Sequence, residues 1–366
     1  MAQIFGSPES YVQGRGVAAE IGTHTESLGG SALLLADEVV MDLVEADVTA
    51  SLQSRDAAVT TAVFSGECSS SEIDRVGELA ADAQAEFVVG AGGGKALDTA
   101  KAVGEDLGLG VVAMPTIAST DAPCSALSVV YTDHGEFESY RFLDRHPDVV
   151  LVDTALVAAA PTRFFTSGIA DALATRFEAD ATMRSAGDNI LGGKDTRAGH
   201  RLAELCYETL RDHGISAVDA VENDAVTESV EAVTEANTLL SGLGFESGGL
   251  AAAHSIHNGL TQLEATHEAT HGEKVNVGTL SQLVLEGRSD EFVEDVVEFS
   301  LDIGLPVKMA DIGLDDPSDE DLLTVAEAAC AEDETIHNEP FDVTPEMVRD
   351  ALVTASEIGR RVERRR

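Results

Sequence analysis

In the first 160 residues, short apolar runs alternate with stretches whose apolar positions recur at helical spacing. An apolar run begins at Ser31, a helix-like stretch covers residues 41–52, and a second strand-like run begins at Ala57. A further apolar run follows at residues 110–116. Strands that alternate with helices are typical of a parallel sheet with helices on its faces. The pattern therefore predicts an α/β fold for this half of the chain.

A glycine cluster follows the strand predicted at Phe87–Val89. The residues are Gly90-Ala91-Gly92-Gly93-Gly94, and a helix is predicted to begin near Lys95. Consecutive glycines let the backbone approach a ligand closely, and the free N–H groups of a helix start bind a pyrophosphate. The cluster matches neither the GxGxxG pattern nor the P-loop pattern. A dinucleotide site is favoured, with an ordinary tight turn as the alternative.

Small polar side chains crowd the loop that follows the apolar run at residues 110–116. If the loops after neighbouring strands meet at one edge of the sheet, this segment lies beside the glycine cluster. The alternative is an ordinary turn rich in serine, threonine and proline. The candidate ligand-binding residues of this loop are Thr116, Ser119, Asp121 and Ser125.

Asp37 stands just past the first apolar run. A carboxylate near the carboxyl end of a strand can accept hydrogen bonds from both hydroxyls of an adenosine ribose and repel a 2′-phosphate. It can equally cap the helix that follows, and on its local sequence the cap is favoured. Farther along, the apolar runs Leu127–Thr132 and Asp148–Val152 flank a polar segment and suggest a hairpin.

After Pro161 the chain shows little strand signal. Apolar positions recur at spacings of three and four residues, which is typical of amphipathic helices. We therefore predict an α/β domain over residues 1–160 and an all-helical domain over residues 161–366. The helical pattern is clearest at Ile169–Phe177, Leu202–Leu210, Val226–Leu243 and Val343–Ile358.

Four of the chain's ten histidines lie close together in the second half, at positions 254, 257, 267 and 271. Neutral imidazole is the commonest protein ligand for a divalent transition metal, and His254 and His257 are one helical turn apart. The spacing matches neither HExxH nor the zinc-finger patterns, so core or surface histidines remain an alternative to a metal site.

Asp171 lies in the segment SGIADALA, among small and apolar residues that predict an inward-facing carboxylate. A buried carboxylate is costly unless it meets a cation or a metal. Asp171 is therefore a candidate third ligand for the histidine segment, with an interhelical salt bridge as the alternative.

The composition is strongly acidic, with 66 Asp and Glu against 23 Lys and Arg and a formal net charge of −43. Such a charge disfavours nucleic acid and anionic membranes as partners. The acidic residues are spread over the whole chain, as in proteins of salt-loving organisms, where concentrated salt screens self-repulsion. We hypothesise that the protein needs molar salt to remain folded; a merely acidic protein is the alternative.

The four cysteines are far apart and form no CxxC pair. This suggests reduced thiols in a cytoplasmic setting. The first ten residues lack the basic and apolar regions of a signal peptide, and no apolar run approaches the length of a membrane span. We expect a cytoplasmic protein.

Several motifs together resemble the glycerol dehydrogenases of the iron-containing, or group III, alcohol dehydrogenases. They occur in family order between about Gly90 and Asn338, with Asp37 ahead of them. The matching segments are GAGGGKALDTAKA, PTIASTDAPCSALSVVY, SGIADALATRFEA, GGLAAAHSIHNGLT, HGEKVNVGTLSQLVLE and AEAACAEDETIHN.

The resemblance implies a dehydroquinate synthase-like fold, with a Rossmann-like NAD-binding domain and a helical metal-binding domain. The metal ligands, which would also contact substrate, would be Asp171, His254 and His271. Asp121 would hydrogen-bond the polyol, and His257 would face the site without being a ligand, leaving His267 a bystander. Cofactor contacts would be made by Asp37, Gly92, Gly93, Gly94, Lys95, Asp98, Thr116, Ser119, Ser125, Leu127 and Tyr131.

The same resemblance implies an NAD-dependent oxidation of glycerol, or a related small vicinal diol, to dihydroxyacetone. Zinc, or iron or manganese in its place, would polarise the alkoxide, and hydride would pass to the nicotinamide. We hypothesise that His257 carries the released proton toward solvent. The family also implies a homo-oligomer.

A glycerol-1-phosphate dehydrogenase is the nearest alternative function. A phosphorylated substrate favours basic residues, whereas the loop from Thr116 to Tyr131 contains no cation. A nucleotide- and zinc-binding protein without catalysis is a more remote alternative.

Overall fold

The computed structural model describes residues 2–366 and groups the chain into two compact units. An α/β unit comprises Ser7–Pro161 and Ala220–Leu239, and a helical unit comprises Met1–Gly6, Thr162–Asp219 and Leu240–Arg366. The α/β unit thus includes a helical segment from the second half of the sequence. A single domain boundary between residues 160 and 161 stays a prediction.

The α/β unit is built on a parallel six-stranded sheet with the order β1-β8-β5-β4-β2-β3. This confirms the α/β fold that the pattern predicts, although the pattern missed β1. The strands are β1 (Ser10–Gly14), β2 (Ser31–Ala36), β3 (Ala58–Val63), β4 (Phe87–Gly92), β5 (Gly110–Pro115) and β8 (Val149–Asp153).

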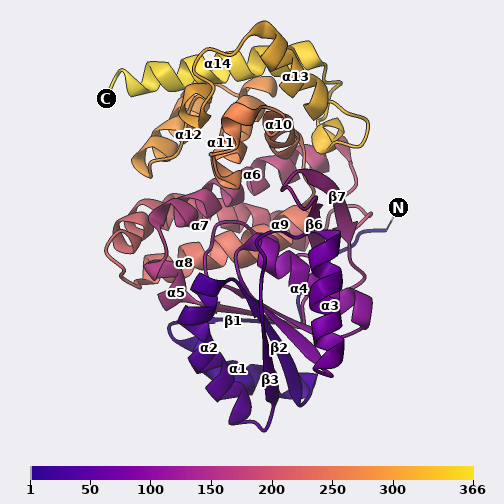
Figure 1. Cartoon of the computed structure of the whole chain (residues 1–366). Coiled ribbons are helices and arrows are strands. Elements are labelled where there is room, and N and C mark those ends of the chain that lie inside the picture. Colours follow the sequence, from indigo (N-terminus) through magenta and orange to yellow (C-terminus); the bar gives the residue numbers. More distant parts are fainter. Residues whose placement is uncertain (1) are drawn as a thin grey trace. The chain divides into compact units, whose positions relative to one another are not determined.

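Helices cover both faces of this sheet, and alternate residues of β2 show how. Leu34 packs into a core with Val44 and other residues of α2 (Glu38–Gln53), whereas Leu33 and Leu35 pack into a second core. That second core contains residues of α3 (Ser70–Asp82) and α4 (Gly94–Leu107). In Figure 1, α1 (Ile21–His24) and α2 flank one side of the strands and α3 and α4 the other. Burial on both faces explains the continuous apolar runs.

The predicted hairpin is wrong in its second strand. β6 (Leu127–Tyr131) pairs antiparallel with β7 (Phe137–Phe142), whereas β8 lies between β1 and β5 in the parallel sheet. All residues of β8 are buried, as expected for a central parallel strand. An apolar run alone does not specify which strand it pairs with.

Short helices complete the α/β unit. The segment Ala220–Leu239 contributes α8 and most of a π-helical turn at Ala236–Leu240. The remaining elements are η1 (Val17–Glu20), η2 (Glu26–Leu28), η3 (Ala122–Cys124), α5 (Thr154–Ala159) and α8 (Glu228–Glu235).

The helical unit is organised around α11, which packs against α6, α10 and α14. Its buried core includes Ile256, Val277, Val325 and Leu352. The helices are α6 (Thr162–Ser185), α7 (Arg197–Val221), α9 (Ser241–Gly248), α10 (Ala252–Leu260), α11 (His271–Leu285), α12 (Asp290–Asp302), α13 (Asp319–Ala329) and α14 (Pro345–Glu363), with short turns η5 (Glu264–Thr266), η6 (Met309–Ile312) and η7 (Thr335–Asn338).

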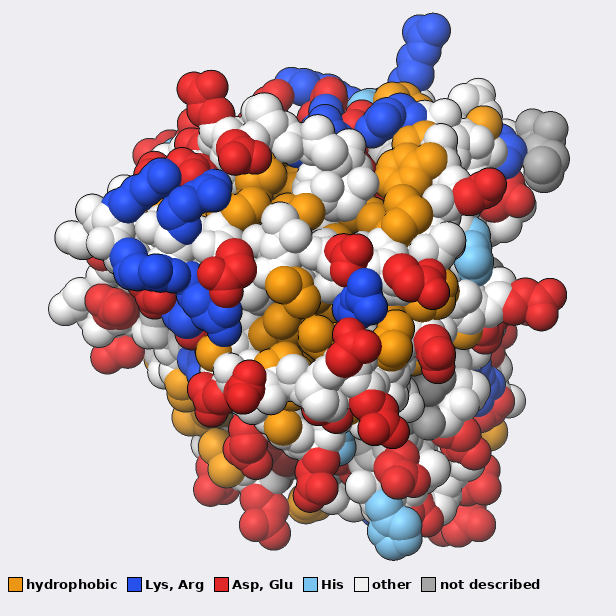
Figure 2. Space-filling model, turned by 90° about the horizontal axis from the view of Figure 1, so that it is seen from above, with side chains coloured by type: hydrophobic (Ala, Val, Ile, Leu, Met, Phe, Trp, Pro, Cys, Tyr) orange, Lys and Arg blue, Asp and Glu red, His pale blue; other side chains and the backbone are white. Residues whose placement is uncertain are grey.

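Acidic side chains are scattered over the face seen in Figure 2 and are not gathered in one patch. This matches the even distribution of Asp and Glu along the sequence. Among the residues that the structure describes, no helix combines the length and apolarity that crossing a membrane requires.

Candidate functional site

Asp171, His254 and His271 meet inside the helical unit. Oδ1 of Asp171 lies 3.2 Å from Nε2 of His254 and 3.1 Å from Nε2 of His271. One donor atom from each residue lies within 4.8 Å of the other two. Asp171 is buried, whereas the side chain of His271 is 35% exposed. The arrangement places two imidazole nitrogens and one carboxylate oxygen at a position that solvent can reach.

The packing of three helices determines this geometry. Asp171 lies in the middle of α6, His254 in the first turns of α10, and His271 at the start of α11. A capping box formed by Thr270 and Glu273 fixes where α11 begins.

Gly272 allows α11 to approach α6 closely. A Cβ atom at this position would lie 1.8 Å from the carbonyl oxygen of Ser167, so any other residue would push the helices apart. The same residue donates its backbone N–H to Oγ of Ser167, at 3.1 Å. The glycine directly after His271 thus brings that histidine next to the helix that carries Asp171.

The electrostatics of the group favour bound positive charge. Burial by itself raises the pKa of Asp171, but His271 and His254 outweigh it and hold the pKa well below its usual range. Burial lowers the pKa of His254, yet the carboxylates of Glu178 and Asp171 raise it well above the ordinary value. A buried carboxylate is costly unless positive charge compensates it, so this group suits a cation.

The donor set fits a divalent transition metal. Two imidazoles and one carboxylate are a three-ligand combination found in catalytic zinc sites, where the remaining position is open to substrate. Glu178 adds a carboxylate that contacts the other nitrogen of His254, an arrangement that fixes the tautomer of a ligating histidine. The ligand roles of Asp171, His254 and His271 stay a prediction.

The other two histidines of the segment differ in position. His257 is buried, its ring centre is 4.3 Å from that of His271, and its Nδ1 lies 3.1 Å from Oδ1 of Asn258. Burial, together with His271, His254 and Lys274, lowers the pKa of His257, which keeps the ring neutral. His267 is exposed, with Nε2 3.1 Å from the carbonyl oxygen of Thr261. The proton-carrier role of His257 stays a prediction.

The glycine cluster lies in the α/β unit where β4 ends and α4 begins. Gly92 has a φ of 141°, a backbone conformation that favours glycine, and Gly93 is an N-cap residue without a side-chain hydrogen bond to the helix. The N–H groups of Ala96 and Leu97 donate to the carbonyl oxygen of Gly93, so an anion such as a pyrophosphate would meet the N–H groups at the very start of α4. Thr116 lies alongside, since its N–H donates to the carbonyl oxygen of Gly92 at 3.1 Å.

Asp37 follows β2, which is the neighbour of β4 in the sheet. Its Oδ1 accepts a hydrogen bond from the N–H of Val40 at 2.9 Å, so Asp37 caps α2 and the cap interpretation is confirmed. A single capping bond leaves the carboxylate with further acceptor capacity. Its ribose role stays a prediction, which its place at the carboxyl edge of the sheet supports.

The remaining predicted cofactor residues lie in α4 and in the segment from Thr116 to Tyr131. Nζ of Lys95 lies 4.9 Å from the centre of the Tyr131 ring and 2.6 Å from Oε1 of Glu67. Asp98 is buried, and its Oδ2 accepts from the N–H of Val129 at 3.0 Å. Asp121 directly precedes η3 and is nearly buried. The same segment carries Ser119, Ser125 and Leu127.

Comparison with known proteins reveals a close relationship over the full length. The chain is 66% identical to the glycolaldehyde reductase of Halobacterium salinarum, with all of both chains covered. It is 50% identical to the glycerol dehydrogenase of Thermotoga maritima over 96% of each chain. The family model described as "Iron-containing alcohol dehydrogenase" matches residues 8–154.

The chain belongs to the iron-containing alcohol dehydrogenase family. Its fold is that of the glycerol dehydrogenases in this family. The structure of the Schizosaccharomyces pombe glycerol dehydrogenase superposes with a TM-score of 0.97 at 38% identity, covering 100% of this chain and 93% of that chain. A probable glycerol dehydrogenase from Sinorhizobium meliloti gives 0.93 at 44% identity, covering 98% and 100%. The resemblance and the fold that the motifs predicted are confirmed.

Two contacts in this family member escaped the sequence analysis. Glu178 was not singled out, although it lies seven residues after Asp171 on the same helix and therefore on the same face. Glu67, which binds Lys95, follows β3 in a polar loop that carries no motif. Helical spacing could have suggested Glu178, whereas nothing in the local sequence indicated Glu67.

Proposed function

We propose that the protein is an NAD-dependent and metal-dependent dehydrogenase that oxidises glycerol, or a related small vicinal diol, to the corresponding hydroxycarbonyl compound. For glycerol the product is dihydroxyacetone. The observation that carries the proposal is the meeting of Asp171, His254 and His271 in a chain similar to glycerol dehydrogenases over nearly its whole length.

Asp171, His254 and His271 would hold the metal, and zinc, iron(II) and manganese(II) all suit this donor set. A divalent ion supplies Lewis-acid polarisation of a substrate oxygen. The chain contributes the orientation of the ligands. Glu178 accepts from Nδ1 of His254, which leaves Nε2 as the nitrogen that faces Asp171.

The edge of the sheet in the α/β unit would hold NAD, which supplies a hydride acceptor. The first turn of α4 offers uncapped N–H groups for the pyrophosphate, and Asp37 offers a carboxylate for the ribose hydroxyls. The other proposed contacts are Lys95, Asp98, Thr116, Ser119, Ser125, Leu127 and Tyr131.

The loop that carries Asp121 favours a neutral substrate. It contains no Lys, Arg or His from Thr116 to Tyr131, whereas a phosphorylated alcohol favours basic residues. We assign Asp121 the role of hydrogen-bonding a hydroxyl of the polyol. Its nearly complete burial supports a fixed orientation.

Reduction of glycolaldehyde is the second candidate function, because the relative from Halobacterium salinarum carries that name. Glycolaldehyde and dihydroxyacetone are both α-hydroxycarbonyl compounds, and the reduced product of glycolaldehyde is the smallest vicinal diol. The same residues therefore serve either substrate. The two functions differ in the preferred chain length and in the direction of net reaction.

One assay series tests these functions. The protein is purified in concentrated salt, its metal content is measured, and the NADH absorbance is followed with glycerol, ethylene glycol, dihydroxyacetone and glycolaldehyde. Glycerol-1-phosphate and dihydroxyacetone phosphate serve as the phosphorylated comparison. Turnover of the neutral pairs supports the proposal, and preference for the phosphorylated pair contradicts it. NADH binding with no turnover would indicate a non-catalytic protein.

The cellular setting and the assembly also stay predictions. The four cysteines are far apart in the sequence and form no CxxC pair, which supports a reducing compartment such as the cytoplasm. We further propose a homo-oligomer, which light scattering of the purified protein tests.

A further inference from the structure

Lys101 is a buried cation to which the proposed function assigns no role. It lies in α4, only 2% exposed, and its Nζ is 2.8 Å from Oδ1 of Asp98. Moving an ammonium group out of water is costly unless charge pairing and hydrogen bonds compensate for the loss. Such complete burial implies that the ammonium group of Lys101 has binding partners inside the protein.

Its ammonium group binds the loop between β5 and β6. Nζ donates to the carbonyl oxygen of Ala122 at 3.0 Å and to that of Leu127. It also lies 3.3 Å from Oγ and 3.4 Å from the carbonyl oxygen of Ser125. An ammonium group has three donors, and this loop together with Asp98 supplies enough acceptors for all of them.

Asp98 extends the same connection. Its Oδ2 accepts from the N–H of Val129 at 3.0 Å, and its carbonyl oxygen accepts from Oγ of Ser128 at 2.9 Å. One helical turn of α4 therefore holds residues 122–129 through both a cation and a carboxylate. Since α4 begins at the glycine cluster, this turn ties that cluster to the polar loop.

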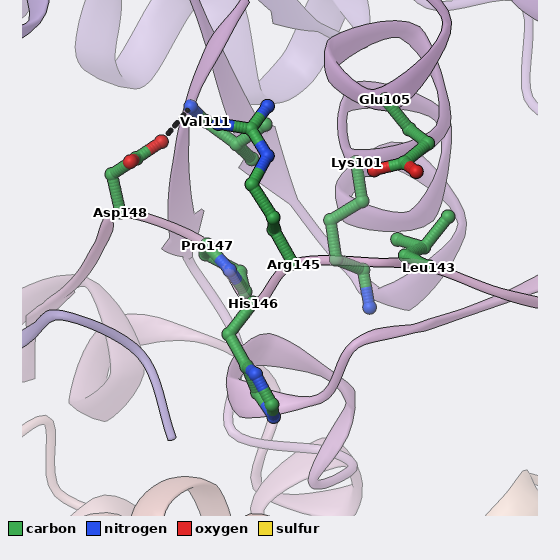
Figure 3. Close-up of a pocket in the computed structure, with 8 residues that line it drawn as sticks. All are labelled: Lys101, Glu105, Val111, Leu143, Arg145, His146, Pro147 and Asp148. Carbon is green, nitrogen blue, oxygen red and sulfur yellow. Dashed lines mark hydrogen bonds between the residues drawn. The ribbon is translucent and has the colours of Figure 1, made fainter. Parts of the chain in front are cut away.

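A small cavity lies beside Lys101. Figure 3 shows Lys101 and Glu105 projecting from α4 toward the chain that carries Leu143 and Arg145. The cavity lined by these residues has a volume of about 10 Å³, roughly what one water molecule needs.

We propose that Lys101 is a positioning residue for NAD binding, which holds residues 122–129 so that Ser125, Leu127 and Asp98 present their contacts to the dinucleotide. The inference rests on the proposed function, since these three residues are among its cofactor contacts. Lys101 itself stays inside the protein and acts through the loop. Charged hydrogen bonds to several carbonyl groups restrict a loop more strongly than neutral ones do.

The test compares the unmodified protein with Lys101→Met in concentrated salt. Direct NADH titration, monitored by nucleotide fluorescence, should give a Kd raised about tenfold or more, the scale expected when charged hydrogen bonds are lost. Hydrogen exchange at the amides of residues 122–129 should accelerate. The metal content, which depends on residues of the helical unit, should stay unchanged.

Arg141→Met is the matched control. Arg141 also links the β6–β7 hairpin to α4, through Asp106, but both side chains are substantially exposed, at 30% and 46%. Removing this cation should leave the Kd for NADH and the exchange at residues 122–129 as they are. If Lys101 only stabilised the fold, Lys101→Met would have a lower melting temperature, while the Kd of the folded variant for NADH would stay unchanged.

An unchanged Kd in folded Lys101→Met overturns the inference. If that variant does not fold, Lys101→Gln replaces it, because its amide keeps two donors without the charge, and the same Kd criterion applies. The experiment distinguishes failure of this inference from failure of the proposed function. An unmodified protein that binds NADH and oxidises diols supports the function whatever the Lys101 variants do, whereas one that binds no NADH contradicts both.

Discussion

Oε2 of Glu178 lies 2.6 Å from Nδ1 of His254, while Nε2 of the same ring faces Asp171. Oε1 of Glu178 meanwhile accepts from the N–H groups of Ala251 and His254, each at 3.0 Å. Glu178 therefore fixes both the ring and the backbone of one predicted ligand. Because the carboxylate is the acceptor in these contacts, an amide would set its NH2 group against Nδ1–H of His254, unless the proton moved to Nε2, the nitrogen predicted to bind the metal.

Glu178→Gln should weaken metal binding about 10- to 100-fold, the range found for residues that orient metal ligands. The measurement is zinc affinity by competition with a chromogenic chelator. Asp180→Asn is the control, because Asp180 lies on the same helix but pairs with Arg288 and Arg176. Equal zinc affinity in the Glu178 variant and the unmodified protein would contradict the positioning role.

His271→Ala should lose bound metal and diol oxidation together. Chelation of the unmodified protein should abolish activity, and adding back zinc should restore it. His267→Ala provides the comparison, since His267 is exposed and its Nε2 contacts only a backbone carbonyl among the bonds described. This second variant should keep its metal. Full activity of His271→Ala after chelation would show that the three residues are not the metal site.

Asp37→Asn should reduce the preference for NAD over NADP. Asparagine caps helices as well as aspartate does, so the bond to Val40 and the stability of α2 should persist while the charge is lost. The ratio of kcat/KM for the two cofactors should therefore shift toward NADP, with little change in melting temperature. An unmodified protein with equal kcat/KM for both cofactors would contradict a ribose role for Asp37.

The sequence predicted those parts of the fold where local signals and global structure agree. Continuous apolar runs and the glycines after Val89 placed β2, β4 and β5, because burial on both faces leaves a plain local pattern. The pairing of β8 was not predictable in this way, since an apolar run does not show which strand it lies beside in the sheet. Glu178 and Lys101 were also missed, because their roles depend on contacts with residues 76 and 21 positions away.

Dialysis into low salt should lower the melting temperature. The chain carries a formal net charge of −43, and the Debye length grows from about 3 Å at 1 M salt to about 30 Å at 0.01 M, so repulsion between acidic residues becomes effective. Pairs such as Arg365 with Glu294 do not offset this, because exposed ion pairs contribute about 1 kcal/mol or less. Scanning calorimetry at several salt concentrations measures the effect, and an undiminished melting temperature would remove the halophilic interpretation.

Glu339→Gln should stabilise the protein increasingly as the pH rises from about 5 to 8. Glu339 is 4% exposed, and burial, followed by the carboxylates of Glu286 and Glu178, raises its pKa to about 8. The unfolded chain loses this proton near pH 4.3, so between the two values unfolding releases a proton and the free energy of unfolding falls by about 1.4 kcal/mol per pH unit. This contribution is complete below the unfolded pKa and lost once the pH passes the folded pKa. The neutral amide has no such loss, so unfolding in denaturant from pH 5 to 9 should show a flatter pH profile for the variant. Glu332→Gln, at an exposed position, should keep the slope of the unmodified protein, and equal slopes in all three proteins would contradict a raised pKa at Glu339.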